Sequence, residues 1–191
     1  GIPAAAPATA ATSTVDTTLE WYDTTAATIA TGTRPQVTNS RAWAISWLAA
    51  ARALRTGAAR HYQDAALASA VHTALSTLIP EGAPTLDATL RNTLERIPDG
   101  RAKDRGVAAG QAEARTLLAQ RAGDGLDPAA VNPPYPAPEP GPGVWQPTPP
   151  TFTAAQQAGT RYATPFLLDR ADQYRPGPPP ALDSKRYRAD L

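Results

Sequence analysis

The stretch Gln36-Val-Thr-Asn-Ser-Arg-Ala-Trp-Ala-Ile-Ser-Trp47, which continues to Leu54, decides the fold. Its apolar residues recur every three or four positions, at Trp43, Trp47, Ala50 and Leu54. This spacing places them on one side of an α-helix, as an amphipathic helix packed on its neighbours requires. Asn39 or Ser40 is expected to cap the start of this helix, and Gly57 lies just beyond its end.

The same spacing recurs in four other segments on either side of this stretch. Their apolar stripes run over Leu19, Tyr22, Ala26 and Ile29, then 67–78, 86–97 and 107–121. Pro80, Pro98 and Gly123 end the later segments, and Thr85 and Asp99 are expected near helix starts. Connections of roughly two to eight residues favour antiparallel neighbours. We therefore predict an all-α fold, with a bundle of about five helices over residues 17–126.

Proline changes the character of the chain near Asp127, because 15 of its 21 prolines fall between residues 128 and 180. Such a segment favours extended polyproline II structure. A flexible linker is one interpretation, but the arm carries many aromatic and apolar residues: Tyr135, Val144, Trp145, Phe152, Tyr162, Phe166 and Leu167. We expect residues 127–182 to form an arm packed on the bundle. Residues 183–191 are expected to begin a further helix, capped by Asp183 or Ser184, at a point where the sequence looks cut.

Composition excludes several classes of function. The chain has 18 Lys and Arg against 17 Asp and Glu, so the basic excess typical of nucleic-acid binding is missing. It has no cysteine, which removes thiolate sites and disulfides, and no apolar run long enough for a membrane span. Residues 1–16 are expected to be disordered or extended. Their Ala- and Pro-rich start resembles what remains after removal of a signal peptide, which favours a secreted protein.

The two histidines, His61 and His72, can share one face of a helix with Asp64. About 12 Å of helix separates Asp64 from His72, however, whereas the ligands of one zinc all lie about 2 Å from the ion. A single His–Asp pair supplies only two ligands. We therefore expect no metal site, with His61 at a helix start and His72 at the edge of the core.

The motifs of hydrolases, nucleotide-binding proteins and zinc proteases are not found in the sequence. Two acidic pairs, Glu20 with Asp23 and Asp124 with Asp127, have spacings that a glycosidase acid and base could use. Helix-surface and turn roles are favoured instead, because neither pair has an apolar setting that would raise a pKa. The sequence thus assigns no catalytic, cofactor-binding or metal-binding residue.

The tryptophans allow two interpretations. Trp43 and Trp47, beside Arg41 and Arg52, could form a surface that binds a ligand or stacks on bases. Roles as core anchors facing the next helix are favoured. Trp145 could dock into a groove of its own bundle, which we favour, or serve as a recognition element for a partner.

Three parts of the chain together carry a family resemblance. They are Leu19-Glu-Trp-Tyr-Asp23, then 36–47 with Tyr62-Gln-Asp-Ala-Ala-Leu67, and finally the arm. The arm reads Gly143-Val-Trp-Gln-Pro-Thr-Pro-Pro150, followed by Pro165-Phe-Leu-Leu168, Gln173-Tyr-Arg-Pro176 and Pro178-Pro-Pro-Ala-Leu-Asp-Ser-Lys-Arg-Tyr187. From about Thr17 onward this order of aromatics and prolines resembles the N-terminal half of bacterial vanadium-dependent haloperoxidase-like proteins. These belong to the type 2 phosphatidic acid phosphatase (PAP2) superfamily.

The resemblance implies an all-α fold whose helical bundle binds vanadate, or phosphate in the phosphatase relatives. Members of the family oxidise halide with hydrogen peroxide, or hydrolyse phosphate esters through a histidine nucleophile. Their oxyanion site needs a lysine, two arginines, a Ser-Gly-His turn and a further histidine, and none of these motifs occurs here. The Lys-x6-Arg-Pro pattern fails at both Arg-Pro pairs, because Ala27 and Leu168 stand seven positions before Arg34 and Arg175.

We therefore expect the vanadate site in a missing C-terminal half, beyond Leu191, and no cofactor in this chain. The chain alone would be an inactive N-terminal portion of a secreted haloperoxidase-like or acid phosphatase-like protein. Its partner would be the C-terminal half of the same protein or a second copy. The alternative is a non-enzymatic secreted helical module that binds a partner or self-assembles, which an exposed apolar face would favour.

Overall fold

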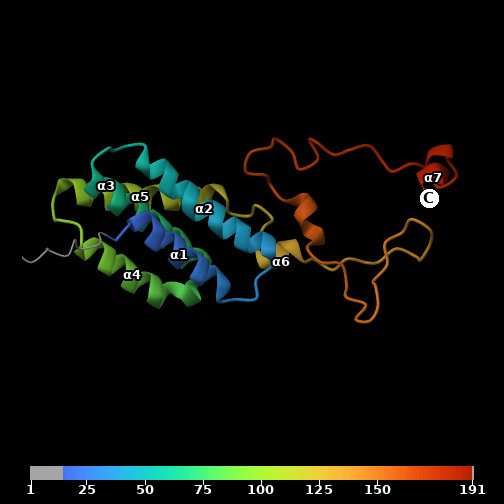
Figure 1. Ribbon diagram of the computed structural model, residues 1–191, viewed down its shortest axis with the longest axis horizontal. Helices are drawn as coiled ribbons and strands as arrows, with labels where there is room; N and C mark the ends of the chain where they lie inside the picture. The colour runs from blue at the N-terminus through green and yellow to red at the C-terminus, as the bar shows by residue number, and fades with distance from the viewer. Residues whose placement is uncertain (1–14, 191) are drawn as a thin grey trace, which may run out of the picture.

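The computed structural model describes residues 15–190, and all the regular structure in that range is helical (Figure 1). The bundle consists of α1 (Thr17–Ala30), α2 (Gln36–Leu54), α3 (Arg60–Leu78), the 3₁₀ turn η1 (Pro80–Gly82), α4 (Ala83–Glu95) and α5 (Arg101–Gln120). The arm contains α6 (Pro128–Val131), the 3₁₀ turn η2 (Ala158–Tyr162) and α7 (Lys185–Asp190). The predicted all-α class and helical bundle are confirmed. The expectation that the chain starts with a disordered or extended segment concerns residues 1–16, and residues 1–14 lie outside the described residues.

Helix α3 is the centre of the bundle and packs against α1, α2, α4 and α5. Its middle, from Ala65 to Val71, consists of small and branched residues that are all buried and, apart from Ser69, apolar. A helix that is apolar all round has to be surrounded, which explains its central position. The most extensive packing contact is with α5, which lies beside α3 in Figure 1.

Two glycines of α5 set the distance between α3 and α5. A Cβ at Gly110 would lie against the carbonyl oxygen of Ala66 and 2.8 Å from the amide nitrogen of Ala70. A Cβ at Gly106 would press on the carbonyl of Tyr62 in the same way. The two backbones are therefore in direct contact, an approach that only residues without a side chain permit.

Several helix starts differ from the sequence expectation. Helix α2 begins at Gln36, after Pro35, so Asn39 and Ser40 lie inside it rather than at its cap. Helix α4 begins at Ala83, directly after the 3₁₀ turn, which places Thr85 inside the helix as well. In both cases a proline at or beside the first turn fixes helical backbone without a side-chain cap. Gly123 does adopt the predicted left-handed conformation after α5, with φ 67°.

Helix α1 buries a different face from the one that its apolar stripe predicts. The buried residues are Trp21, Ile29 and three threonines, whereas Leu19 and Tyr22 are 62% and 52% exposed. Two of these threonines satisfy their hydroxyls within the helix: Thr25 Oγ1 donates to the carbonyl of Trp21 at 2.6 Å, and Thr28 Oγ1 to that of Thr24 at 2.7 Å. Within the predicted stripe Ile29 is buried as expected, but the prediction was wrong for Leu19, Tyr22 and Ala26, which are exposed. The consequence is an exposed apolar surface.

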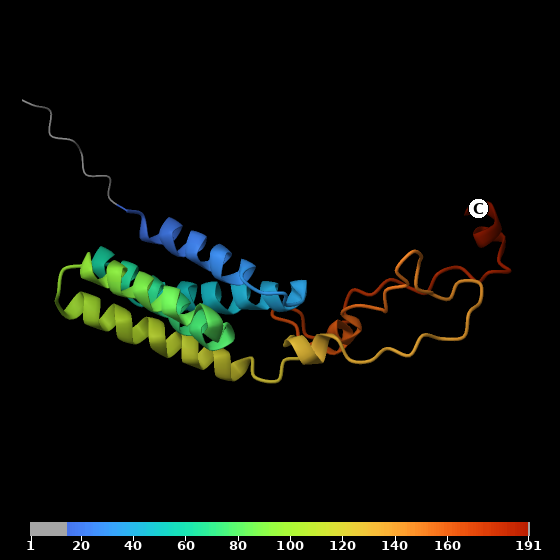
Figure 2. The same ribbon diagram turned by 90° about the horizontal axis from the view of Figure 1, so that it is seen from below.

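The arm contacts the bundle at one end and then runs away from it (Figures 1 and 2). Residues 157–166 return to the bundle, but 136–153 and 167–179 are almost entirely exposed or half-buried. The expected packing of the arm on the bundle thus holds only for its middle. At its far end α7 begins where predicted, and the Ser184 hydroxyl accepts the backbone N–H of Tyr187 at 3.1 Å. No helix within residues 15–190 combines the length and apolar character needed to cross a membrane.

Candidate functional site

A buried cluster of charges, which we call the Asp124 clamp, joins the end of α5 to the start of α2. It consists of Asp124, Arg41 and Arg121, whose side chains are 3%, 11% and 9% exposed. Arg41 Nε donates to the two carboxylate oxygens at 2.9 and 2.8 Å, and Arg121 Nε donates to one of them at 3.0 Å. Buried charges are tolerated only when they are paired and hydrogen-bonded, as these are. The clamp therefore fixes the turn after α5 against α2.

The clamp also holds the arm. Arg121 Nη1 and Nη2 donate to the carbonyls of Pro165 and Thr164 at 3.0 and 2.5 Å, and its guanidinium carbon lies 3.8 Å from the ring centre of Phe166. The backbone N–H of Thr164 donates to the carbonyl of Asp124 at 2.9 Å. Residues 164–166 are thus attached by main-chain, charged and cation–π contacts together.

A second attachment involves Gln157, which lies just before η2. Its side-chain oxygen accepts the backbone N–H of Val37 at 3.3 Å, and its own backbone N–H donates to Asn132 Oδ1 at 2.7 Å. A Cβ at Gly159 would press on the carbonyl of Ala130, so η2 and α6 are in backbone contact. The start of α2, α6 and η2 therefore form one joint from which the rest of the arm extends.

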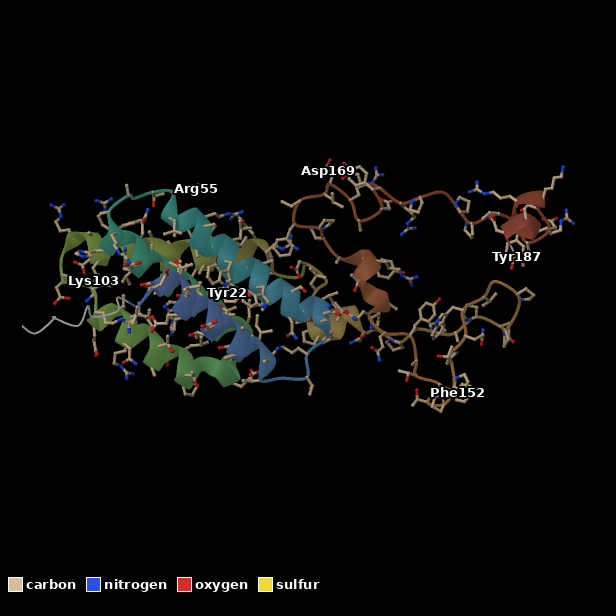
Figure 3. All side chains as sticks on the ribbon, in the orientation of Figure 1. Tyr22, Arg55, Lys103, Phe152, Asp169 and Tyr187 are labelled. Atoms are coloured by element: carbon tan, nitrogen blue, oxygen red, sulfur yellow. The ribbon has the colours of Figure 1, made fainter. Side chains whose placement is uncertain are left out.

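The exposed surface of α1 and α2 carries three aromatic rings, Tyr22, Trp43 and Trp47, which we call the aromatic face. The ring centres of Tyr22 lie 5.2 Å from Trp43 and 6.2 Å from Trp47, and the two indoles stack at 6.3 Å with 29° between their planes. Figure 3 labels Tyr22 on α1 within this surface. The two tryptophans do pack against the core, as predicted, but they are only partly buried. Neither Arg41 nor Arg52 bonds to this face: Arg41 belongs to the clamp, and Arg52 donates to Gln120.

An open groove of about 740 Å³ runs beside α1, between that helix and η1 with the start of α4. Ala27 and threonine side chains of α1 line it, and the carboxylates of Asp23 and Glu81 lie at its edges. Glu81 is paired with Arg34. The lining contains no histidine or lysine, so the groove offers shape and a carboxylate but no group for acid–base or nucleophilic chemistry.

One small pocket brings two arginines together with a histidine, and it is the natural place to test a vanadate or phosphate site. It has a volume of about 230 Å³, and Arg60, His61 and Arg96 contribute to its wall. Arg60 pairs with Asp64 at 3.4 Å, and Arg96 pairs with Glu20 at 2.5 Å. Each guanidinium already has a carboxylate, and those carboxylates would repel an oxyanion.

The Asp124 clamp fails the same test, because its two arginines are buried and bonded to Asp124 and to arm carbonyls. A further open pocket of about 400 Å³ is lined by Arg161, Arg170 and Arg175 but by no histidine or lysine. None of these three places therefore offers the lysine, arginine and histidine set that the family resemblance implies. Within residues 15–190, no three His, Cys, Asp or Glu side chains come together in a way that could hold a metal ion.

The structure separates the two histidines. His61 is exposed in the first turn of α3, where the sequence places it, and Asp64 pairs with Arg60 rather than with a histidine. His72 Nε2 lies 2.7 Å from Asp87 Oδ1, and its ring meets the edge of the buried Trp21 at 6.5 Å between centres. His72 is thus at the edge of the core, as predicted, in a contact that joins α3 to α4.

The acidic pairs are also separated by their partners. Glu20 accepts from Thr93 Oγ1 at 2.9 Å and pairs with an arginine, while Asp23 lies at the edge of the groove. Asp127 caps α6 by accepting the backbone N–H groups of its first turn, which is the turn role predicted for it. Asp124 is a correction, because a helix-surface or turn role was expected for it and the structure buries it between two arginines. Sequence spacing could not reveal this, since Arg41 is 83 positions away.

Trp145 does not dock into a groove of its own bundle, contrary to the favoured expectation. It is 47% exposed, and its ring lies edge-on to that of the arm residue Tyr135, at 6.2 Å between ring centres. The guanidinium of Arg161 lies above the rings of Tyr135 and Tyr162 at 5.9 and 4.7 Å. The arm therefore has its own small aromatic cluster, built around Arg161 of η2.

Comparison with known proteins identifies no relative: no family model, no curated protein and no solved structure matches this chain.

Proposed function

We propose that this chain is the non-catalytic N-terminal helical portion of a secreted vanadium-dependent haloperoxidase-like or PAP2-type acid phosphatase-like protein. In this proposal the vanadate or phosphate site belongs to a C-terminal half, and the present chain supports and partly covers it. The order of aromatics and prolines in the arm supports the family. The assignment of that site to the C-terminal half rests on the sequence, in which the Lys-x6-Arg-Pro and Ser-Gly-His motifs of the family do not occur.

One observation carries the supporting role: the arm is rigidly attached at one end and exposes aromatic residues at the other. The Asp124 clamp and Gln157 fix its base to the bundle. Beyond that base, Trp145 and Phe152 are 47% and 62% exposed (Figure 3 labels Phe152). A segment fixed at its base with large apolar side chains in water is suited to covering another protein surface.

Vanadate binding and turnover test this proposal directly. Purified chain of residues 1–191 would be titrated with orthovanadate and followed by ⁵¹V NMR, then assayed for peroxide-dependent halide oxidation and for phosphate-ester hydrolysis. We expect no vanadate binding and neither activity from the chain alone, and both binding and one of the activities from the protein containing the C-terminal half. Vanadate bound by the chain alone would refute the non-catalytic role. Failure of the longer protein to bind vanadate or phosphate would refute the family assignment.

A second candidate function is a non-enzymatic binding or self-assembling module. The aromatic face favours it, because Tyr22 and the neighbouring Leu19 are more than half exposed beside two partly buried tryptophans. Sedimentation velocity of the purified chain over a range of concentrations tests this candidate. A concentration-dependent rise in sedimentation coefficient is expected, and a constant monomer value would contradict it.

A further inference from the structure

The aromatic face has the features of a surface that binds polyproline. Such segments dock into grooves lined by aromatic rings, and they present backbone carbonyls that accept hydrogen bonds from ring N–H groups. Here the three rings lie 5.2 to 6.3 Å apart between centres and form a continuous apolar surface. Trp47 Nε1 donates to Thr25 Oγ1 at 3.2 Å, whereas the Trp43 indole N–H has no acceptor within residues 15–190. One ring N–H is therefore available to a ligand carbonyl.

The chain also displays a matching ligand. The segment Tyr174-Arg-Pro-Gly-Pro-Pro-Pro180 is exposed along its length except for the half-buried last proline, and Tyr174 is 76% exposed. Four prolines within five residues, 176–180, favour the polyproline II conformation before any partner is met, which lowers the entropy lost on binding. Leu182, two residues after this segment, packs on Gly143: a Cβ added to that glycine would lie 3.6 Å from Leu182 Cδ2. The end of the segment is therefore held against the arm.

Charged residues beside the aromatic face and beside the proline segment would fix the orientation in which the segment docks. Asp23 is exposed and adjacent to Tyr22, and α1 contains acidic residues but no basic one. Arg175 directly precedes the proline run, and no carboxylate pairs with it within residues 15–190. A proline run docked on the aromatic face can therefore place the arginine beside the carboxylate, which would fix its orientation.

The path of the arm indicates which molecule it meets. Both views show the segment leading to α7 far from the bundle that carries the aromatic face (Figures 1 and 2). A second copy carries the same face and the same segment. The segment of each molecule can therefore bind the aromatic face of the other, which gives a closed dimer with two-fold symmetry. Two such contacts in one dimer reinforce each other, because the second forms within an already tethered pair.

We propose that residues 174–180 of one molecule dock on the aromatic face of a second copy, with the prolines on the rings and Arg175 beside Asp23. This inference deepens the second candidate function and rests on it, while it is independent of the haloperoxidase-like proposal. The haloperoxidase-like proposal assigns the exposed aromatics of 145–162 to another protein surface, so the two proposals use different parts of the arm.

Sedimentation velocity on the full chain and matched variants tests the docking. Wild-type protein is expected to shift with concentration from 20.0 kDa toward twice that mass. The double variant Pro178→Ala, Pro179→Ala and the face variant Tyr22→Ser are each expected to remain monomeric over the same range. The control, Pro138→Ala with Pro140→Ala, removes two prolines from the other proline-rich stretch and should associate like wild type. Tyr22 is exposed, and circular dichroism verifies that each variant retains its helices.

Mixing the two defective variants separates reciprocal exchange from a general loss of association. The Tyr22→Ser chain keeps an intact arm and the Pro178→Ala, Pro179→Ala chain keeps an intact face, so a mixed dimer has one working contact. We expect the mixture to associate where neither variant does alone. Its dissociation constant should exceed that of wild type by about 10²-fold or more, because the second, tethered contact is lost.

Each other outcome overturns the proposal in a recognisable way. A wild-type chain that stays monomeric overturns it together with the second candidate function. Association that survives the Pro178→Ala, Pro179→Ala change overturns the docking but leaves self-assembly standing. A monomeric wild type whose tryptophan fluorescence responds to that change would show that the arm docks on its own bundle instead.

Discussion

Replacing Asp124 with asparagine is the sharpest test of how the arm is held. The substitution preserves the shape of the side chain but removes its charge, and it places an amide donor where an oxygen now accepts from Arg41 or Arg121. Both guanidinium groups would remain buried, at 11% and 9% exposure, without a counter-charge. Removing one partner of a buried ion pair costs about 3–5 kcal/mol. For a chain of this length we expect the melting temperature to fall by about 6–20 °C.

The matched control is Asp127→Asn, three residues further along the chain. Asp127 caps α6, and asparagine caps a helix about as well, so its effect should stay within about 0.5 kcal/mol. Thermal unfolding followed by circular dichroism measures both variants, and trypsin digestion reports whether the arm is released. If Asp124→Asn melted like Asp127→Asn and showed no faster cleavage in the arm, the clamp would not be what holds the arm.

Three further substitutions test other parts of the account. Gly110→Ala should destabilise the fold by about 1–3 kcal/mol despite a better helix propensity, because the new Cβ would press on the α3 backbone; an unchanged urea midpoint would contradict the close α3–α5 crossing. The hydrogen bond from Lys103 lowers the pKa of Asp99 below 3.8, so NMR titration of Lys103→Met should show that pKa rising, and an identical titration would rule the contact out. Because the pKa of Asp99 is lower in the folded than in the unfolded protein, its ionised form stabilises the fold above the unfolded-state pKa. That stabilisation is lost as the pH falls through the folded-state pKa, so Lys103→Met should lose less stability in acid than the wild type. Gln157→Ala removes the side-chain oxygen that accepts the Val37 N–H and so loosens the joint between the arm and α2. It should speed tryptic cleavage of the arm without a large change in melting temperature, and unchanged cleavage would show that this contact is dispensable.

The fold class followed from the sequence because it depends on local periodicity and on proline. Helical spacing over 43–54 and 67–78, and the density of prolines after Asp127, are properties of short windows, and the helices and the arm lie where these windows place them. The helix starts were less accurate. A proline beside the first turn replaced the side-chain caps expected at Asn39 and Thr85.

The errors with functional consequences concern which face of an element is buried. In α1, apolar spacing selected Leu19 and Tyr22, but the bundle buries Trp21 and threonines, whose hydroxyls bond to the preceding turn. A threonine can therefore behave as a core residue in a helix, and a hydropathy pattern counts it as polar. The aromatic face exists because of this inversion.

The clamp could not be predicted for a different reason. Asp124 and Arg41 come together only through the packing of α2 against the end of α5, and nothing local marks either as buried. Trp145 shows the converse, since its size suggested an anchor docked on the bundle, and it is instead 47% exposed.

The central claim, that this chain is the supporting portion of a larger haloperoxidase-like or phosphatase-like protein, is tested most directly by the intact and native masses of the protein isolated from its natural source. The account predicts a parent chain well above 20.0 kDa, or a companion polypeptide of different sequence bound to this one. A protein that consists only of 20.0 kDa chains, alone or associated with copies of themselves, would contradict that claim and leave the self-assembling helical module.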